Sequence, residues 1–301
     1  MLQIDTLTPP KPLPFCEFAS LYLSSVRNRL KSIHQLEFRI KKFVRRFDSK
    51  PVNEIRRVDI SEYIDERLKQ GINPGTINLE ISAVSSAYRH AVNIWGWNLQ
   101  NPVIGQQLRQ PEGRLRYLTE TEKRDLFNAA TYPKTKPYLV HFLNLAINTG
   151  CRKSELLKLT WRDVDMTIPA ITITSANSKN GKRRIIPLNK AATDSINQLF
   201  RMRNQHNPSS PWVFTRDNGK PLRCVDNAFK RACKRAGIQD FRIHDLRHTF
   251  ASDLVKAGVS LYHVKKLLGH SSINQTERYA HLATDALTQA VTVLDEINKA
   301  R

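Results

Sequence analysis

A break in the pattern of apolar residues at positions 98–116 divides the chain into two parts. This stretch, NLQNPVIGQQLRQPEGRLR, carries two prolines and two glycines and has no apolar periodicity, which is typical of a linker. The length of 301 residues fits two domains of about 100–200 residues each. We therefore predict a proline-rich extended tail at 1–14, a first domain at 15–108, a linker at 109–116 and a second domain at 117–301.

Apolar residues of the first part recur at steps of three or four, which is the spacing of one helix face. The series are Phe15, Phe18, Tyr22, Val26 and Leu30; Ile33, Leu36, Ile40, Phe43 and Phe47; and Ile77, Ile81, Val84, Tyr88 and Val92. A further helix is predicted at 60–70, capped by Asp59 and ended by Gly71. The first domain is therefore predicted to be a bundle of four helices.

The second part mixes helical and strand patterns. Thr119 and Glu122 have the spacing of a capping box, and helices are expected from there to about residue 159. Residues 170–174 and 183–188 read as two strands joined by a turn at Asn180 and Gly181. The helical pattern returns from 189, with breaks near 207–221 and 237–243, and ends in an amphipathic helix at 285–299. The predicted class is mainly α with a small β-sheet (α+β) in the second domain.

The charge of the chain indicates a polyanionic partner. There are 48 Lys and Arg against 27 Asp and Glu, a net charge of +21, and both parts of the chain are basic. Nucleic acid is favoured over a membrane surface because no single short helix concentrates the charge. On one predicted helix the cations could form a solvated face, but with this net charge we favour phosphate contact. They are Arg39, Lys41, Lys42, Arg45 and Arg46.

The cysteines and apolar runs set limits on the class of protein. Cys16, Cys151, Cys224 and Cys233 lack the paired spacing of zinc sites or secreted disulfide frameworks, so we expect reduced thiols in an intracellular protein. The apolar run at 137–147 is too short to span a membrane. The N-terminus lacks the charged and apolar regions of a signal peptide.

Four separated stretches carry unusual polar residues. They are TGCRKSELLKLTWRDVD (149–165) with Arg152 and Glu155, SKNGKRRIIPL (178–188) with Lys179, HDLRHTFASDL (244–254) with His244 and Arg247, and LLGHSSINQTERYAHL (267–282) with His270 and Tyr279. Each alone has an ordinary explanation, such as an Arg152–Glu155 pair or a core ring for Tyr279. His244 and His248 even mimic a zinc pair, but Asp245 replaces the expected Glu and no third ligand is evident.

Taken together and in this order, the four stretches resemble those of the tyrosine recombinases, also called phage integrases, which include the Xer-type recombinases. The resemblance spans nearly the whole chain and is strongest over 149–188 and 244–282. It implies a helical DNA-clamping domain followed by a catalytic domain. The implied catalytic residues are Arg152, Lys179, His244, Arg247, His270 and Tyr279. Asn180 stands where the family usually has Thr, and the cations that follow it, Lys182, Arg183 and Arg184, are expected to bind DNA.

The resemblance implies strand exchange in DNA through a 3′-phosphotyrosyl intermediate, with no metal, cofactor or ATP. Tyr279 is the expected nucleophile, Lys179 the acid for the leaving 5′-oxygen, and His244 the base. Two arginines suit the phosphate because their guanidinium groups are planar and bidentate, and Glu155 is expected to orient Arg152. The sequence agrees, because it contains no G-x-x-x-x-G-K-[ST] loop and no carboxylate cluster of the two-metal type.

The implied partners are double-stranded DNA with paired inverted half-sites, three further copies of the chain in a tetrameric synapse, and accessory recombination proteins. A cytoplasmic, nucleoid-associated protein of bacterial or phage origin is expected, with no membrane partner. Two other functions remain open at this point: DNA relaxation of the type IB topoisomerase kind, and a non-enzymatic basic DNA-binding protein. The sequence specifies neither the target site nor whether the role is chromosome dimer resolution, integration or transposition.

Overall fold

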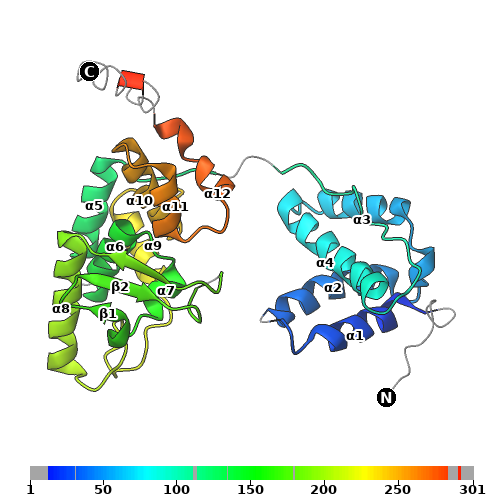
Figure 1. Cartoon of the computed structure of the whole chain (residues 1–301), viewed down its shortest axis with the longest axis horizontal. Coiled ribbons are helices and arrows are strands. Elements are labelled where there is room, and N and C mark those ends of the chain that lie inside the picture. Colours follow the sequence, from blue (N-terminus) through cyan, green and yellow to red (C-terminus); the bar gives the residue numbers. More distant parts are fainter. Residues whose placement is uncertain are drawn as a thin grey trace, which may run out of the picture. The chain divides into compact units, whose positions relative to one another are not determined.

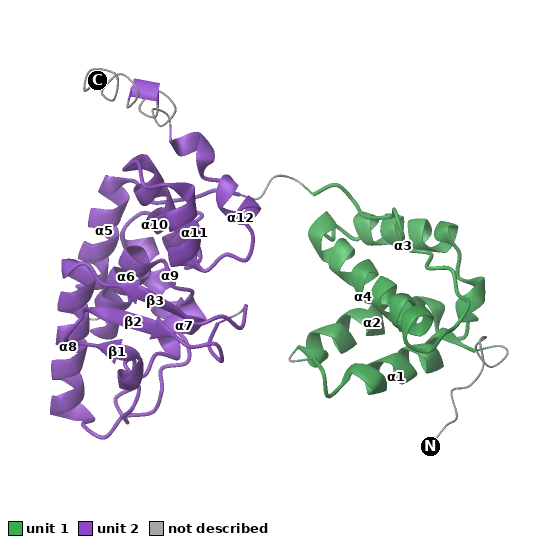
Figure 2. Ribbon diagram, viewed as in Figure 1, with its two compact units in different colours: residues 1–113 green, residues 114–301 purple. Residues whose placement is uncertain are grey.

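The computed structural model describes residues 13–30, 32–110, 114–133, 135–178, 180–283 and 291–292. The chain forms two compact units, Met1–Gly113 and Arg114–Arg301 (Figure 2). The boundary between them falls inside the stretch 109–116 that was predicted as a linker.

The first unit is helical, as its apolar periodicity predicts. Its elements are α1 (Phe15–Val26), α2 (Ile33–Phe47), a 3-10 turn η1 (Val52–Glu54), α3 (Arg57–Lys69) and α4 (Pro74–Asn93). Phe18, Phe43, Ile77 and Tyr88 are completely buried where these helices meet. Leu30 and Val92, at the ends of two predicted faces, are exposed, and Leu30 lies beyond the end of α1.

The start of α3 differs from the prediction. Asp59 does not precede the helix but lies in its first turn, where its carboxylate accepts a hydrogen bond of 2.7 Å from the backbone N–H of Arg56. The next helix, α4, is capped by Asn73, whose side chain accepts from the N–H of Thr76 at 2.8 Å, and Pro74 takes its first position.

The second unit contains more helices and a small sheet (Figure 1). In chain order its elements are α5 (Glu120–Ala130), α6 (Tyr138–Thr149), α7 (Lys153–Leu157), η2 (Trp161–Asp163), β1 (Val164–Asp165), β2 (Ala170–Ile173), β3 (Arg184–Pro187), α8 (Lys190–His206), α9 (Asp226–Arg235), α10 (Asp245–Lys256), α11 (Leu261–Leu268), α12 (Asn274–Glu277) and η3 (Ala280–Leu282). The predicted capping box is confirmed, since Thr119 and Glu122 exchange hydrogen bonds of 2.9 and 3.2 Å at the start of α5.

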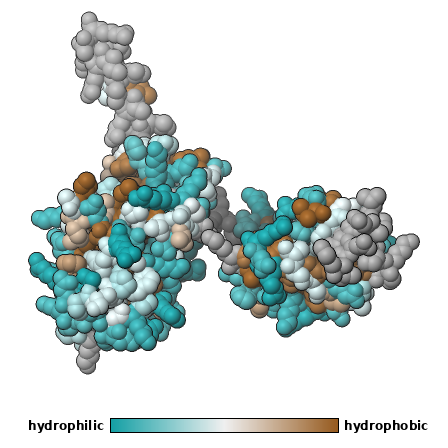
Figure 3. Space-filling view, turned by 60° about the horizontal axis from the view of Figure 1, so that its bottom comes forward, coloured by the Kyte–Doolittle hydropathy of each residue, from teal (hydrophilic) through white to brown (hydrophobic). Residues whose placement is uncertain are grey.

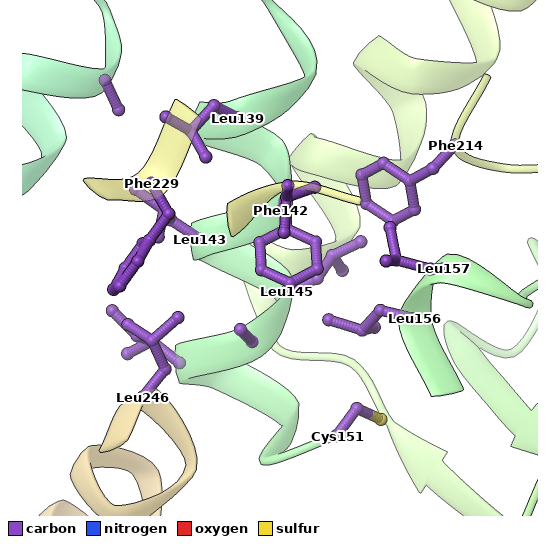
Figure 4. Packing of buried hydrophobic residues seen from close by; sticks show 14 of the residues in the cluster. Leu139, Phe142, Leu143, Leu145, Cys151, Leu156, Leu157, Phe214, Phe229 and Leu246 are labelled. Atoms are coloured by element: carbon purple, nitrogen blue, oxygen red, sulfur yellow. The ribbon is translucent and has the colours of Figure 1, made fainter. Parts of the chain in front are cut away.

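Helix α6 is the centre of the second unit, and it packs against α8 on one side and α10 on the other (Figure 1). Figure 4 shows its side chains Leu139, Phe142, Leu143 and Leu145 pointing into a core that the other helices and loops complete. All four are completely buried. Burial of large apolar side chains contributes about 1.5–3 kcal/mol each, so this core fixes the end of α6, next to which Arg152 lies.

The sheet is antiparallel, with strand order β1-β2-β3. Ile171 pairs with Ile186 and Thr172 with Ile185, which places the predicted strands in the predicted hairpin. The strand β1 has only two residues and was not predicted. The fold class is confirmed: both units are mainly helical, and the sheet belongs to the second unit.

The surface of both units is predominantly hydrophilic in the face shown by Figure 3. None of the helices in the described part of the chain is long and apolar enough to cross a membrane. The helix predicted at 285–299 lies outside the described residues, apart from positions 291 and 292.

Candidate active site

Two helices of the second unit end in glycines with left-handed backbone, and both ends meet Arg247. Gly150 follows α6 with φ +62°, and Gly269 follows α11 with φ +66°. Arg247, on the first turn of α10, donates from Nη1 to the carbonyl of Gly150 and from Nη2 to that of Leu268, each at 2.7 Å. A cation is stabilised there, because the C-terminal end of a helix carries partial negative charge.

The charge of Arg247 is only partly compensated, by the nearby carboxylate of Glu155. Arg247 is 3% exposed, and none of the carboxylates in the described part of the chain forms an ion pair with it. Burial, and next the charge of the neighbouring Arg152, lower the pKa of Arg247 to about 10. An anion that enters this site would therefore relieve a real electrostatic cost.

One buried carboxylate, Glu155, is shared by two arginines. Arg152 stands just before α7, and its Nη1 donates to Oε1 of Glu155 at 2.9 Å, while its backbone N–H donates to Oε2 at 2.8 Å. Arg184, at the start of β3, donates from Nη1 to Oε1 at 3.0 Å and from Nη2 to Oε2 at 2.7 Å. Burial acts to raise the pKa of Glu155, but the bonds and charges of Arg184 and Arg152 outweigh it and hold that pKa below its ordinary value.

Tyr279 lies between α12 and the 3-10 turn η3, directly before Ala280, and is 1% exposed. Its hydroxyl is 2.5 Å from Nδ1 of His248, which lies on α10. Burial raises the pKa of Tyr279 to about 12, although the positive charges of Arg247 and Arg278 act in the opposite direction. In this conformation the phenol is protonated at neutral pH and closed to a large substrate.

Three histidines belong to the same site, and one of them, His248, contacts this hydroxyl. The ring of His244, just before α10, meets the ring of His248 edge to face at 5.1 Å between centroids. His270 follows Gly269, and its Nδ1 is 2.8 Å from Oγ1 of Thr276. Burial comes first in lowering the pKa of each: His248 to about 4, His270 to about 3, and His244 below its ordinary value. All three are thus neutral at pH 7.

The structure brings together five of the six residues expected to be catalytic: Arg152, His244, Arg247, His270 and Tyr279. The sixth, Lys179, lies outside the described residues, between Ser178 and Asn180. Asn180 is described, and its side-chain amide donates to the carbonyl of Gly269 at 2.9 Å, which attaches the hairpin to the turn before His270.

Arg184 was expected to contact DNA and is placed otherwise. Its guanidinium makes two bonds to Glu155, its Nε donates to the carbonyl of Leu267 at 3.1 Å, and its side chain is only 10% exposed. Lys182 and Arg183 are exposed, and they line a hollow of about 440 Å³ with Lys265, Lys266 and His270.

The cations predicted on the first unit lie on α2. Lys42, Arg45 and Arg46 line a hollow of about 300 Å³ together with residues of α3. Arg46 also forms ion pairs with Glu62 at 3.5 Å and Glu66 at 3.4 Å. Arg39 is half-buried and Lys41 is exposed on the same helix.

Sequence reasoning missed two features of the site. His248 was considered only as half of a zinc pair, whereas it contacts the phenol; its position four residues after His244 places it on the same helix face and was the available signal. Lys265 and Lys266 were not singled out because they look like ordinary charges on α11. In the described residues no group of three or more His, Cys, Asp or Glu side chains is arranged to hold a metal ion.

Sequence comparison gives the family. Residues 116–285 match the phage integrase family, and residues 14–120 match the phage integrase N-terminal domain. The integrase of Salmonella phage P22 is 32% identical over 231 residues, which cover 72% of this chain and 56% of that protein. The shufflon-specific DNA recombinase of Escherichia coli is 31% identical over 276 residues, covering 87% and 67%, and the tyrosine recombinase XerC of Staphylococcus haemolyticus is 29% identical over 241 residues, covering 76% and 78%.

Solved structures share the fold. The Tn1549 transposon integrase in complex with transposon right end DNA superimposes with a TM-score of 0.80 at 20% identity, covering 94% of this chain and 100% of that one. A lambda integrase dimer bound to a core site gives 0.74 at 21% identity, covering 89% and 95%. The chain belongs to the phage integrase family, the tyrosine recombinases, which are enzymes that cleave and rejoin DNA.

Proposed function

We propose that this chain is a site-specific recombinase in which Tyr279 attacks a DNA backbone phosphate and forms a 3′-phosphotyrosyl link. The observation that carries the proposal is the surplus of cations around a buried phenol. Arg152, Arg184 and Arg247 gather around a single carboxylate, that of Glu155. A phosphodiester is the anion that would balance this charge and present an electrophile to the tyrosine.

In the proposed reaction the guanidinium groups of Arg152 and Arg247 bind the non-bridging phosphate oxygens, and the ring N–H of His270 donates to the same oxygens. Negative charge on these oxygens grows in the pentavalent transition state, so fixed cations stabilise it more than they stabilise the substrate. The bond between Tyr279 Oη and phosphorus forms as the bond to the 5′-oxygen breaks. The energy of the diester is retained, and a 5′-hydroxyl can later reverse the step.

Two proton transfers complete the proposal. Lys179 protonates the leaving 5′-oxygen, which would otherwise depart as a poorly stable alkoxide. His244 takes the proton of Tyr279, and it is neutral at pH 7 and therefore able to accept one. The phenol is 1% exposed and bonded to His248, so cleavage requires Tyr279 to leave this position when DNA binds.

The proposal includes assembly on DNA. A lambda integrase structure is a tetramer bound to a Holliday junction. We infer that four copies of this chain likewise act on two sites with inverted half-sites, and that the predicted helix 285–299 packs on a neighbouring copy. An apolar hollow of about 470 Å³ on the second unit, lined by Ile147, Ile186, Phe250, Leu254 and Leu267, suits such a helix. Truncation after Thr284 should leave binding of one protomer intact and reduce cooperative binding and recombination.

The test of this function is recombination between two cognate sites on one plasmid, with a metal chelator present and ATP absent. The sites are found first by sequencing DNA that becomes covalently attached to the protein in cells. The wild-type protein should give recombinant circles, and Tyr279→Phe should give none while it still binds the site. Relaxation of single-site plasmids without any recombination would indicate a topoisomerase instead and would contradict the proposal.

A further inference from the structure

Arg184 connects three segments of the site. Its strand β3 belongs to the hairpin that carries Lys179, its two Nη atoms bind Glu155 beside Arg152, and its Nε binds the carbonyl of Leu267 at the end of α11. Its side chain lies directly against Gly269: a Cβ at that glycine would be 3.0 Å from Cδ and 3.2 Å from Nε of Arg184. His270 follows that glycine, so Arg184 packs against the turn that places this histidine.

The shared carboxylate determines how Arg152 is held. Glu155 has no exposed side-chain surface, and both of its oxygens already accept from Arg184. Arg152 therefore makes only one side-chain bond to it, from Nη1. Among the residues that the structure describes, none accepts a hydrogen bond from the Nε or Nη2 of Arg152, which leaves these donors for a ligand.

We propose that Arg184 is a positioning residue that occupies Glu155 and thereby keeps the guanidinium of Arg152 available to the scissile phosphate. Without Arg184, the buried carboxylate would have Arg152 as its one remaining ion-pair partner among the described residues. A two-point bond would then turn the guanidinium of Arg152 toward the protein, because an unpaired buried charge is costly and the bidentate arrangement is favoured. The inference rests on the proposed role of Arg152 at the phosphate.

The mechanism predicts an unusual double-mutant cycle. Arg184→Ala should leave the DNA affinity within about 3-fold of the wild-type value. It should slow cleavage of a nicked suicide site by about 10-fold or more at saturating protein, which is the scale of coupling inside one ion-pair network. Adding Glu155→Gln to Arg184→Ala removes the charge that captures Arg152. The double variant should therefore cleave faster than Arg184→Ala alone.

A matched control is available in the first unit. Arg67 makes a similar two-point bond to the buried Glu80, at 2.8 and 3.0 Å. The side chains of Arg67 and Glu80 are 14% and 4% exposed, and those of Arg184 and Glu155 are 10% and 0% exposed. Arg67→Lys should lower the unfolding temperature without changing the saturated cleavage rate, whereas Arg184→Lys should lower both. If Arg184→Ala does not fold, the cycle with Glu155→Gln is run on Arg184→Lys.

Two results would overturn the inference. If the effects of Arg184→Ala and Glu155→Gln simply multiply, Arg184 does not act through Glu155. If Arg184→Ala mainly weakens DNA binding and lowers its salt dependence, Arg184 is a phosphate contact. Both results presuppose a wild-type protein that forms a covalent adduct with DNA, so absence of that adduct would refute the proposed function and not this inference alone.

Discussion

The hydrogen bond between Tyr279 and His248 links the site to pH at the scale of single residues. The pKa of His248 is lowered by burial, and next by the charges of His244 and Arg278, to about 4, from an ordinary value of 6.5. The neutral form is therefore the one that the fold stabilises, and its Nδ1 is hydrogen-bonded to the phenolic hydroxyl of Tyr279. Below pH 6.5, His248 becomes protonated in the unfolded chain but stays neutral in the folded chain. The folded state therefore loses stability as the pH falls toward 4.

This loss of stability at low pH gives a prediction for the variant His248→Gln, which keeps a polar side chain but does not titrate. Wild-type protein should lose about 2 kcal/mol more of unfolding free energy than the variant between pH 7 and pH 5. Urea unfolding of the two proteins at both pH values measures this difference. His244 and His270 remain in both proteins, so only the part of their titration that is coupled to the charge of His248 differs between the two. Equal losses in the two proteins would show that His248 is not held neutral by the fold.

The residues of the candidate site could be singled out from the sequence, and the structure brings five of them together, but their partners could not be predicted. Arg152, Arg247, His270 and Tyr279 stand inside recognisable local motifs, so short windows of sequence were sufficient. Arg184 looked like one more cation of the run 182–184, because its pairing with Glu155 joins segments 29 positions apart. A local pattern contains no information about such a long-range contact.

At the scale of elements, the ends of α6 and α11 determine where Arg247 lies. Gly150 and Gly237 both have left-handed backbone, with φ +62° and +69°, but their surroundings differ. A Cβ at Gly150 would be 2.4 Å from Cδ1 of Phe250 and 2.8 Å from Cδ2 of Leu268, whereas a Cβ at Gly237 would meet nothing within 4 Å. An alanine at Gly237 would therefore suffer backbone strain alone, whereas an alanine at Gly150 would suffer both backbone strain and steric overlap.

We predict that Gly237→Ala costs only the strain of the left-handed conformation, about 1–2 kcal/mol. Gly150→Ala should cost clearly more, and it should also slow DNA cleavage because the carbonyl of Gly150 accepts from Arg247. Denaturant unfolding and single-turnover cleavage measure the two effects. Equal destabilisation, with unchanged cleavage in both variants, would mean that the end of α6 does not hold the site in place.

Elements with a repeated apolar spacing or a clear turn signal could be predicted, and elements with neither could not. The helices α1, α2 and α4 repeat their apolar spacing over three or more turns, and the two strands of the hairpin flank an Asn-Gly turn. The two-residue strand β1 is too short for any periodicity. The start of α3 was misplaced because an acidic residue is favoured both before a helix and in its first turn, and Asp59 occupies the latter position.

At the scale of the whole molecule, a net charge of +21 predicts that DNA binding depends strongly on salt. A protein that contacts about 8 phosphates should give a slope near −7 in a plot of log affinity against log salt concentration. Replacement of both Lys182 and Arg183 by glutamine should reduce the slope by about 2. Fluorescence anisotropy over a series of salt concentrations measures both values. A flat dependence would contradict the assignment of a DNA partner.

The central claim is that Tyr279 becomes covalently joined to DNA, and its most direct test is identification of the joined residue. The wild-type protein is incubated with a nicked suicide site, digested with protease and nuclease, and analysed by mass spectrometry. We predict a nucleotide attached through a 3′-phosphate to the peptide that contains Tyr279, and no adduct with Tyr279→Phe. Attachment to another residue, or an adduct that persists in Tyr279→Phe, would contradict this account of the site.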